Sequence, residues 1–225
     1  MKNIILAFFV CSSIAVKAQS KIPFYLRVEM NQSNVKNADG RIQKGPGAIN
    51  LGGGIETIIP LIKGKTANLL AFDPSVTYLP TGYKTLNSTY KVKVNYIAIA
   101  LPLIYASNLG IIQKLMGYHS VNTDDQYKFF FGAGPYFNYA VSGKFMLTSI
   151  DDYKKMSFGN GINDNRTATD AGAAIKLGMK IPRCLVGIQK NIGISNVIPN
   201  DRISNGSYIK TRSFLFSVSY NIGKK

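Results

Sequence analysis

Side chains with catalytic potential are sparse in this chain of 225 residues, which contains a single histidine, His119. A hydrolytic site needs a histidine that acts with a serine or a carboxylate. His119 lies in the link from Ser107 to Gln126, which the strand pattern described below places at the inner end of the molecule. We therefore expect no hydrolase triad and no enzymatic activity.

Metal and nucleotide sites are not indicated either. The carboxylate pairs Asp124-Asp125 and Asp151-Asp152 lack the alternating ligand spacing of a calcium loop. The glycine-rich runs 52–54 and 132–134 lack the following helix and lysine of a phosphate cradle. Cys184 is the one cysteine after the N-terminal segment, so neither an internal disulfide nor a cysteine-based metal site is expected. The sequence thus predicts no cofactor and no metal.

Several segments alternate between apolar and polar residues, and their charged side chains fall on one face. Between Thr169 and Ile181, one parity holds only alanine and larger apolar residues, and the other holds Asp170, Lys176, Lys180, two glycines and an alanine. Because side chains on a strand point to opposite faces in turn, this segment is apolar on one side and charged or small on the other. The charged positions assigned to the second face across the chain are Arg27, Glu29, Glu56, Asp73, Lys128, Asp170, Lys176 and Lys180.

About eight segments show strand-like alternation of this kind, and most are long enough to cross a bilayer when tilted. Pro74 removes one hydrogen-bond donor from its strand, so we expect a bulge there. The expected strands are 24–31, 49–59, 70–78, 92–105, 128–141, 169–181, 185–194 and 211–222.

The connections between these strands alternate in length. Short turns are expected at 63–65 and 182–184, and the link 107–126 is a long exception on the same side. The opposite side carries four long segments rich in Asn, Gly, Lys and Asp. These expected outer loops are 31–46, 81–91, 142–168 and 195–209. This arrangement is typical of an up-and-down barrel with both termini on the inner side.

The N-terminus resembles a secretory signal. Lys2 precedes an apolar stretch from Ile4 to Val16, and Val16-Lys17-Ala18 fits a signal-peptidase site. The stretch is shorter than the roughly 20 residues of a spanning helix. We expect cleavage after Ala18, which also removes Cys11, and a single mature domain, 19–225.

Removing the signal lowers the formal charge from +16 to +14, because Lys2 and Lys17 leave with it. Anionic lipid headgroups and surface polysaccharide are the expected partners of such charge on an exported protein, and nucleic acid is not. Solvated basic loops that keep the chain soluble before insertion are the alternative.

These observations predict an all-β fold: a closed antiparallel up-and-down transmembrane β-barrel of about eight strands, with lipid outside. Charges of both signs would pair within a narrow, side-chain-filled lumen. Aromatic rows fit a lipid-facing exterior with aromatic girdles. The expected lipid-facing aromatic residues are Phe129, Phe131, Phe137, Tyr139, Phe214, Phe216 and Tyr220.

Several motifs occur in the order found in PorT-like outer-membrane β-barrels of the Bacteroidota, which this chain resembles over most of its mature length. The matching segments are 72–84, 100–105, 131–139, 142–144 and 187–192, followed by the closing Ser219-Tyr220-Asn221-Ile222. The resemblance implies a small barrel of the OmpX/OmpA kind in the outer membrane of a Gram-negative bacterium. A few family members serve protein secretion and gliding machinery.

The chain departs from this family in two places. The glutamate usual before the Ile/Leu-Pro of the fourth strand is absent, with Ala98 and Ala100 in that region. The sequence also continues past the last strand into Gly223-Lys224-Lys225, where such barrels commonly stop on an aromatic residue.

Three functions remain open at this point. The first is a structural or interaction barrel, an accessory of a secretion or surface machinery, with long basic extracellular loops. Its expected partners are outer-membrane lipid and lipopolysaccharide, the barrel-assembly machinery during insertion, and a protein partner at the loops. The second is a small-solute channel or transporter, which a lumen of roughly eight strands disfavours. The third is a soluble lipid-binding β-calyx.

Overall fold

The computed structural model describes residues 22–37, 42–43, 49–63, 69–84, 90–108, 128–147, 152–202 and 207–223. Their regular structure is β, apart from one 3-10 turn, η1 (Asn200–Arg202). No helix within these ranges is long and apolar enough to cross a membrane. The expected signal segment, 1–18, and the link residues 109–127, with His119, lie outside the described residues.

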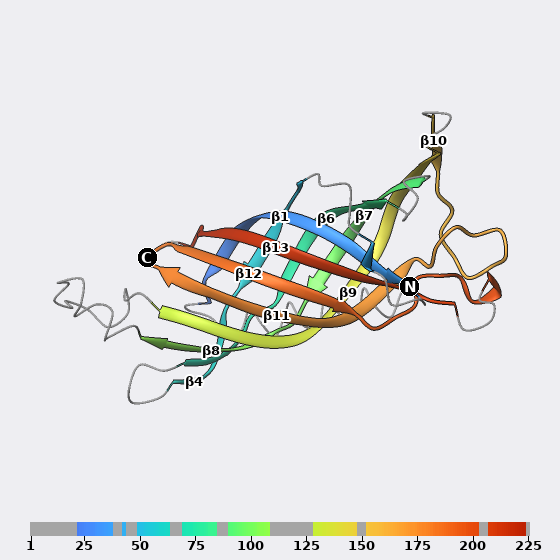
Figure 1. The fold of residues 1–225 in the computed structure, drawn as a ribbon. Coiled ribbons are helices and arrows are strands. Elements are labelled where there is room, and N and C mark those ends of the chain that lie inside the picture. The colour runs from blue at the N-terminus through green and yellow to red at the C-terminus, as the bar shows by residue number, and fades with distance from the viewer. Residues whose placement is uncertain are drawn as a thin grey trace, which may run out of the picture.

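Eight antiparallel strands close into a barrel (Figure 1). Five of them are β1 (Phe24–Asn37), β9 (Lys128–Leu147), β11 (Thr169–Ile181), β12 (Cys184–Gly193) and β13 (Ile209–Asn221). The other three are each formed by two consecutive segments: β3 (Asn50–Thr57) with β4 (Ile59–Lys63), β5 (Leu69–Phe72) with β6 (Ser75–Lys84), and β7 (Tyr90–Ala100) with β8 (Leu103–Asn108). Neighbours along the chain pair around the ring, and β13 pairs with β1 to close it. The predicted fold class is confirmed.

The paired segments are continuous strands that lack a few ladder hydrogen bonds. Pro74 and Pro102 have no N–H to donate at two of the interruptions. The register is the same on both sides of them, with Phe72 opposite Leu103 and Ser75 opposite Ala100. The carbonyl of Pro74 still accepts a hydrogen bond, which the backbone N–H of Thr57 donates at 3.0 Å. The bulge predicted at Pro74 is therefore wrong. Register shifts occur instead between Pro60 and Ile62, and between Asn95 and Tyr96.

The two ends of the barrel differ. Phe24 and Asn221 lie at one end, called here the terminal end, together with the 182–183 turn between β11 and β12. The other end, called the loop end, carries β10 (Asp152–Lys155), which pairs with the far part of β9 and projects beyond the barrel (Figure 1). The strands extend further toward the loop end than the sequence indicated. β1 runs to Asn37 and pairs there with the short β2 (Ile42–Gln43), and β9 runs to Leu147, inside two of the expected loops.

Glycines make room for aromatic rings that fill the interior. Gly178 is directly opposite Phe130, and Gly172 is directly opposite Tyr136. A Cβ at Gly178 would overlap the Phe130 ring, and one at Gly172 would lie 2.7 Å from a Tyr136 ring carbon. Both aromatic side chains are buried. A glycine covered by a cross-strand aromatic lets the sheet curve while the barrel stays packed.

Candidate functional site in the barrel interior

A network of buried ions lies inside the barrel near the terminal end. Arg27 on β1 contacts Glu29 through Nε at 2.8 Å and Glu56 of β3 through Nη1 at 2.9 Å. Lys176 on β11 contacts the other Glu56 oxygen at 2.5 Å and Asp73 at 2.6 Å. All five side chains are 1–2% exposed. Glu56 thus joins the two cations, and the ionic network links strands on opposite parts of the barrel wall.

Neutral polar groups complete the ionic network. Ser219 on β13 donates to Glu56 Oε2 at 2.8 Å, and Arg27 donates to the Gln189 side chain at 3.3 Å. Gln189 in turn donates to Asn191 at 2.8 Å. Along their strands these residues alternate with outward side chains that are mostly apolar, so the strand period that exposes the apolar side chains also buries these polar groups together.

The ionic network contains three carboxylates and two cations. Fully ionised, it carries one net negative charge, and one oxygen of Glu29 and one of Asp73 have no hydrogen-bond partner among the described residues. Breaking a pair in such a network leaves a buried charge without compensation, which is costly. The arrangement fixes the positions of four strands relative to one another.

Asp170 belongs to a separate polar cluster nearer the loop end. Its carboxylate accepts hydrogen bonds from Thr211 at 2.6 Å, Ser195 at 3.1 Å and Asn138 at 3.2 Å. The Tyr136 hydroxyl lies 3.3 Å from the Thr211 hydroxyl. Asp170 thus anchors β9, β11 and β13 through neutral donors and forms none of the described ion pairs.

Lys128 and Lys180 stand apart from both groups. They are directly opposite each other at the terminal end of the β9–β11 pair and are half-buried. Of the eight charged residues predicted for the lumen, the structure therefore joins Arg27, Glu29, Glu56, Asp73 and Lys176 in the ionic network, places Asp170 in a second cluster, and leaves these two lysines at the rim.

Arg166 covers the interior at the loop end. It lies in the segment after β10, is 3% exposed, and donates to the Tyr83 hydroxyl at 3.1 Å. Its guanidinium also faces the rings of Tyr83 and Tyr96, at 5.8 and 5.9 Å. Burial acts to lower the pKa of Arg166, but Tyr96, Tyr83 and Asp170 raise it above its ordinary value, so the side chain stays charged. Sequence reasoning placed this residue in a solvated loop.

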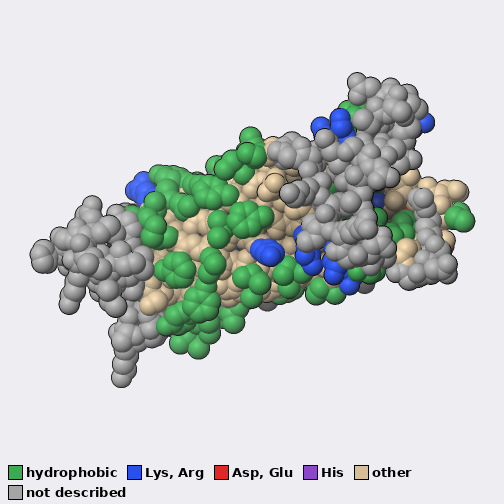
Figure 2. Space-filling model, viewed as in Figure 1, with side chains coloured by type: hydrophobic (Ala, Val, Ile, Leu, Met, Phe, Trp, Pro, Cys, Tyr) green, Lys and Arg blue, Asp and Glu red, His purple; other side chains and the backbone are tan. Residues whose placement is uncertain are grey.

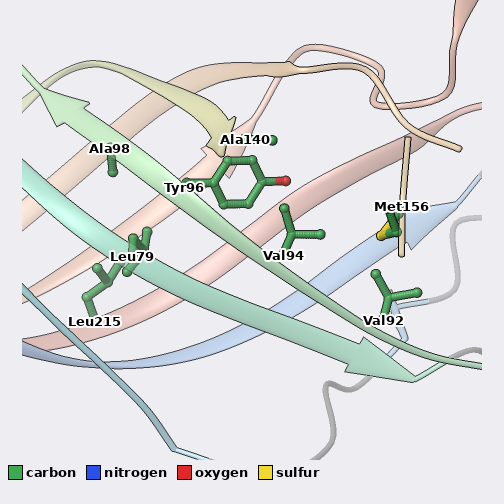
Figure 3. Packing of buried hydrophobic residues seen from close by; sticks show 8 residues of the cluster. All are labelled: Leu79, Val92, Val94, Tyr96, Ala98, Ala140, Met156 and Leu215. Carbon is green, nitrogen blue, oxygen red and sulfur yellow. The ribbon is translucent and has the colours of Figure 1, made fainter. Parts of the chain in front are cut away.

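Apolar layers occupy the two ends of the interior. At the loop end, Leu79, Val94 and Tyr96 pack with Leu215 and with Met156, which follows β10 (Figure 3). At the terminal end, a second cluster includes Tyr25, Ile104, Phe130 and Leu185. The interior thus has apolar layers on both sides of the polar groups.

The interior leaves little free space. One cavity of about 10 Å³ lies between the ionic network and Tyr136, and another of about 20 Å³ lies beneath Arg166. A cavity needs about 10–15 Å³ to hold a water molecule, so each of these has room for about one.

The seven aromatic residues predicted to face lipid lie on the outer surface. They are 37–58% exposed, whereas Ser217 and Ser219, which alternate with three of them on β13, are 3% and 1% exposed. Figure 2 shows apolar side chains covering the middle of the barrel on the face in view. The exposures are Phe129 42%, Phe131 51%, Phe137 51%, Tyr139 58%, Phe214 48%, Phe216 37% and Tyr220 46%.

No group of three or more potential metal ligands occurs within the described ranges. The carboxylate pair Asp124-Asp125 lies outside them, and so do Asp151 and the side chain of Asp152. The neutral members of the two polar groups, chiefly Ser219, Gln189 and Thr211, were not among the predicted lumen residues. The alternation of Ser219 with exposed Val218 and Tyr220 was an available signal, whereas Thr211 lies between Lys210 and Arg212 and had none of this kind.

No family model matches the sequence, and no curated protein matches it. Among the solved structures that resemble the chain are three small outer-membrane proteins of low sequence identity. Ail, the attachment invasion locus protein of Yersinia pestis, is 8% identical, with 89% of this chain and 99% of that chain covered and a TM-score of 0.43. Neisserial surface protein A (NspA) is 14% identical, with 88% and 97% covered and a TM-score of 0.40. The outer membrane protein OprG from Pseudomonas aeruginosa is 11% identical, with 91% and 98% covered and a TM-score of 0.43.

Proposed function

We propose that this protein is a small non-enzymatic outer-membrane β-barrel with a side-chain-filled lumen, which acts as a structural or interaction protein through its loop end. The observation that carries the proposal is the distribution of side chains. Large apolar residues cover the outside of a closed barrel, while ionised and hydrogen-bonded groups lie inside. A contiguous apolar surface of this kind is unfavourable in water and is what a barrel in lipid requires.

The interior argues against the soluble lipid-binding calyx. A calyx for an apolar ligand needs a cavity lined mainly by apolar groups. Here Arg27, Glu56 and Lys176 lie between the two apolar layers of the interior, and both cations pair with Glu56. The two described cavities each hold about one water molecule, far less than a lipid needs.

The same packing argues against a small-solute channel. Eight strands enclose an interior just wide enough for side chains to fill. The apolar layers and the ionic network lie across this interior, and Arg166 covers it at the loop end. Solute passage would require these side chains to move apart together, with the loss of several charge-assisted hydrogen bonds.

The orientation follows from the usual arrangement of outer-membrane barrels. Their termini and short turns face the periplasm, and their longer loops face outward. The terminal end would then be periplasmic and the loop end extracellular. Export would follow removal of the signal after Ala18, and insertion would need the barrel-assembly machinery. Surface contacts would be made with lipopolysaccharide and with a protein partner at the loops.

Membership of the PorT-like family and an accessory role in a secretion or surface machinery are the finer parts of the proposal. They are supported by the order of the sequence motifs, of which 131–139 forms part of β9 and 219–222 includes the end of β13. Mild crosslinking in intact cells, followed by purification and identification of the attached proteins, tests this role. Recovery of no partner above the level of an unrelated barrel would contradict it.

Two measurements test the coarser proposal. Envelope fractionation should recover the protein in a membrane fraction that resists salt and alkaline extraction and dissolves in detergent. Release by salt alone would favour the calyx. The purified barrel in a planar bilayer should give no steady single-channel current, and stable open-channel conductance would favour the transporter.

A further inference from the structure

Three lysines form a row across adjacent strands on the outer surface near the loop end. Lys93 on β7 is directly opposite Lys144 on β9, and Lys144 is directly opposite Lys155 on β10. Residues directly opposite each other in antiparallel strands share a face, and all three side chains are exposed. They are called here the lysine row.

The lysine row is electrostatically unfavourable by itself. Like charges directly opposite each other on neighbouring strands destabilise their pairing. No ion pair links any of the three ammonium groups to a carboxylate among the described side chains. Their neighbour is Tyr153, whose ring lies 4.4 Å from Lys144 Nζ and 5.5 Å from Lys93 Nζ. Such cation–π contacts orient the lysines but do not neutralise them.

Four of the eleven acidic residues of the sequence, Glu29, Glu56, Asp73 and Asp170, are buried inside the barrel and do not contact the lysine row. Asp152 begins β10, three residues before Lys155, and its side chain lies outside the described residues. No acidic side chain is visible on the face drawn in Figure 2, where lysine and arginine lie mainly toward the loop end. Among the described side chains no carboxylate pairs with the lysine row, so an anion from outside the chain can serve as its counter-charge.

The lysine row lies just beyond the apolar surface. Below it, Asn95 donates to the Ser142 hydroxyl at 2.9 Å, and below that pair Ile97 and Tyr139 are directly opposite each other and exposed. Lys93 is four residues from Ile97, about 13 Å along the strand. Long lysine side chains can lie along such a surface while the ammonium groups reach the headgroup layer.

We propose that the lysine row binds the phosphate groups of an anionic lipid in the adjoining leaflet, with Tyr153 holding two of the ammonium groups in place. This inference rests on the proposed function, because it requires the apolar surface to be in a bilayer. In the outer leaflet of an outer membrane the phosphorylated lipid is lipopolysaccharide, whose lipid A carries phosphates at the boundary between acyl chains and water. The loop-end position of the row fits that leaflet.

The test compares lipid binding by three forms of the full barrel, each first shown to be folded by its heat-dependent gel mobility. They are the unchanged protein, the row variant Lys93→Gln/Lys144→Gln/Lys155→Gln, and a control variant, Lys36→Gln/Lys210→Gln/Arg212→Gln. The control removes the same charge from the loop-end part of β1 and β13. Native mass spectrometry measures the binding of bisphosphorylated lipid A and of its phosphate-free form.

The unchanged barrel should bind the phosphorylated lipid A at least about tenfold more tightly than the phosphate-free form, and the row variant should lose about tenfold or more. The control variant should stay within about twofold of the unchanged protein. If the row variant and the control variant lost affinity for phosphorylated lipid A equally, the proposed site would be wrong, because binding would then depend on total charge and not on the lysine row. Complete displacement of lipid A by millimolar inorganic phosphate would overturn the lipid as the ligand.

Insertion into a bilayer without lipid A separates the lipid site from the proposed function. Insertion into phosphatidylcholine vesicles is measured for the unchanged barrel before any lipid A is added. Failure to insert would contradict the proposed function and the lipid site together. Insertion with no preference for phosphate would contradict the lipid site alone.

Discussion

Replacing Lys176 with methionine removes the cation that joins Glu56 to Asp73. Methionine keeps most of the side-chain length but cannot donate the bonds of 2.5 and 2.6 Å. Arg27 and Ser219 still contact Glu56, whereas no described cation contacts Asp73 after the change. The net charge of the ionic network changes from −1 to −2 in the fully ionised state.

The expected loss is large because the site is buried. Each hydrogen bond to a charged group contributes about 1.5–3 kcal/mol, and breaking a buried ion pair by removing one partner costs about 3–5 kcal/mol. We therefore expect Lys176→Met to lower the free energy of unfolding by about 4 kcal/mol. Adding Asp73→Asn returns the formal charge to −1, so the double variant should recover about half of this loss.

The assay is equilibrium unfolding in urea of the barrel inserted in lipid vesicles. The chain has no tryptophan, so the folded fraction is measured from gel mobility without heating and from circular dichroism. A loss below about 1 kcal/mol for Lys176→Met, or additive losses in the double variant, would refute the paired network.

Three further predictions concern other parts of the barrel. Gly178→Val should lower the free energy of unfolding by about 2–3 kcal/mol, because its Cβ would overlap the Phe130 ring and the Val186 carbonyl. Gly53→Ala is the control and should have little effect, since a Cβ there would lie 3.4 Å from its nearest atom. Urea titrations measure both variants, and equal losses of unfolding free energy would contradict the packing argument. Lys190 is exposed on the outer surface directly opposite Ile175 and Phe214, so Lys190→Leu should stabilise the barrel in vesicles by about 1–2 kcal/mol. Destabilisation by this change would argue against lipid at this position. Arg166→Gln should accelerate cleavage of 156–168 by proteinase K about tenfold while the strands stay protected, because the Tyr83 bond and both ring contacts are lost. Unchanged cleavage would show that Arg166 does not hold this segment.

The alternation of side chains made most of the barrel predictable. Apolar residues on one parity of 169–181 and 211–222 determine which face is outside, because a shift of one residue would reverse every side chain. The same parity placed Arg27, Glu56 and Lys176 inside. Phe214, Phe216 and Tyr220 share one parity of 211–222, and the other parity holds Ser213, Ser217 and Ser219.

The contacts inside the barrel could not be predicted from parity. Which inward charges meet depends on the register between strands far apart in the sequence, so Lys176 pairs with Glu56 and Asp73 while Lys180, four residues later, lies at the rim. Pro74 indicated a bulge, but its strand is straight enough to keep register, and the observed shift at Asn95 has no proline. Arg166 lies in a segment without alternation, so no sequence period indicated that it covers the interior.

In a closed lipid-embedded barrel, the outward side chains of β13 contact lipid and its inward side chains pack in the interior. Nuclear Overhauser effects between lipid acyl protons and the side chains of the barrel in nanodiscs measure this directly, without any substitution. We predict contacts from lipid to Phe214, Phe216, Val218 and Tyr220, and none to Leu215, Ser217 or Ser219. Overhauser effects from lipid or from bulk water to Leu215, Ser217 or Ser219 would contradict a closed barrel with a filled interior.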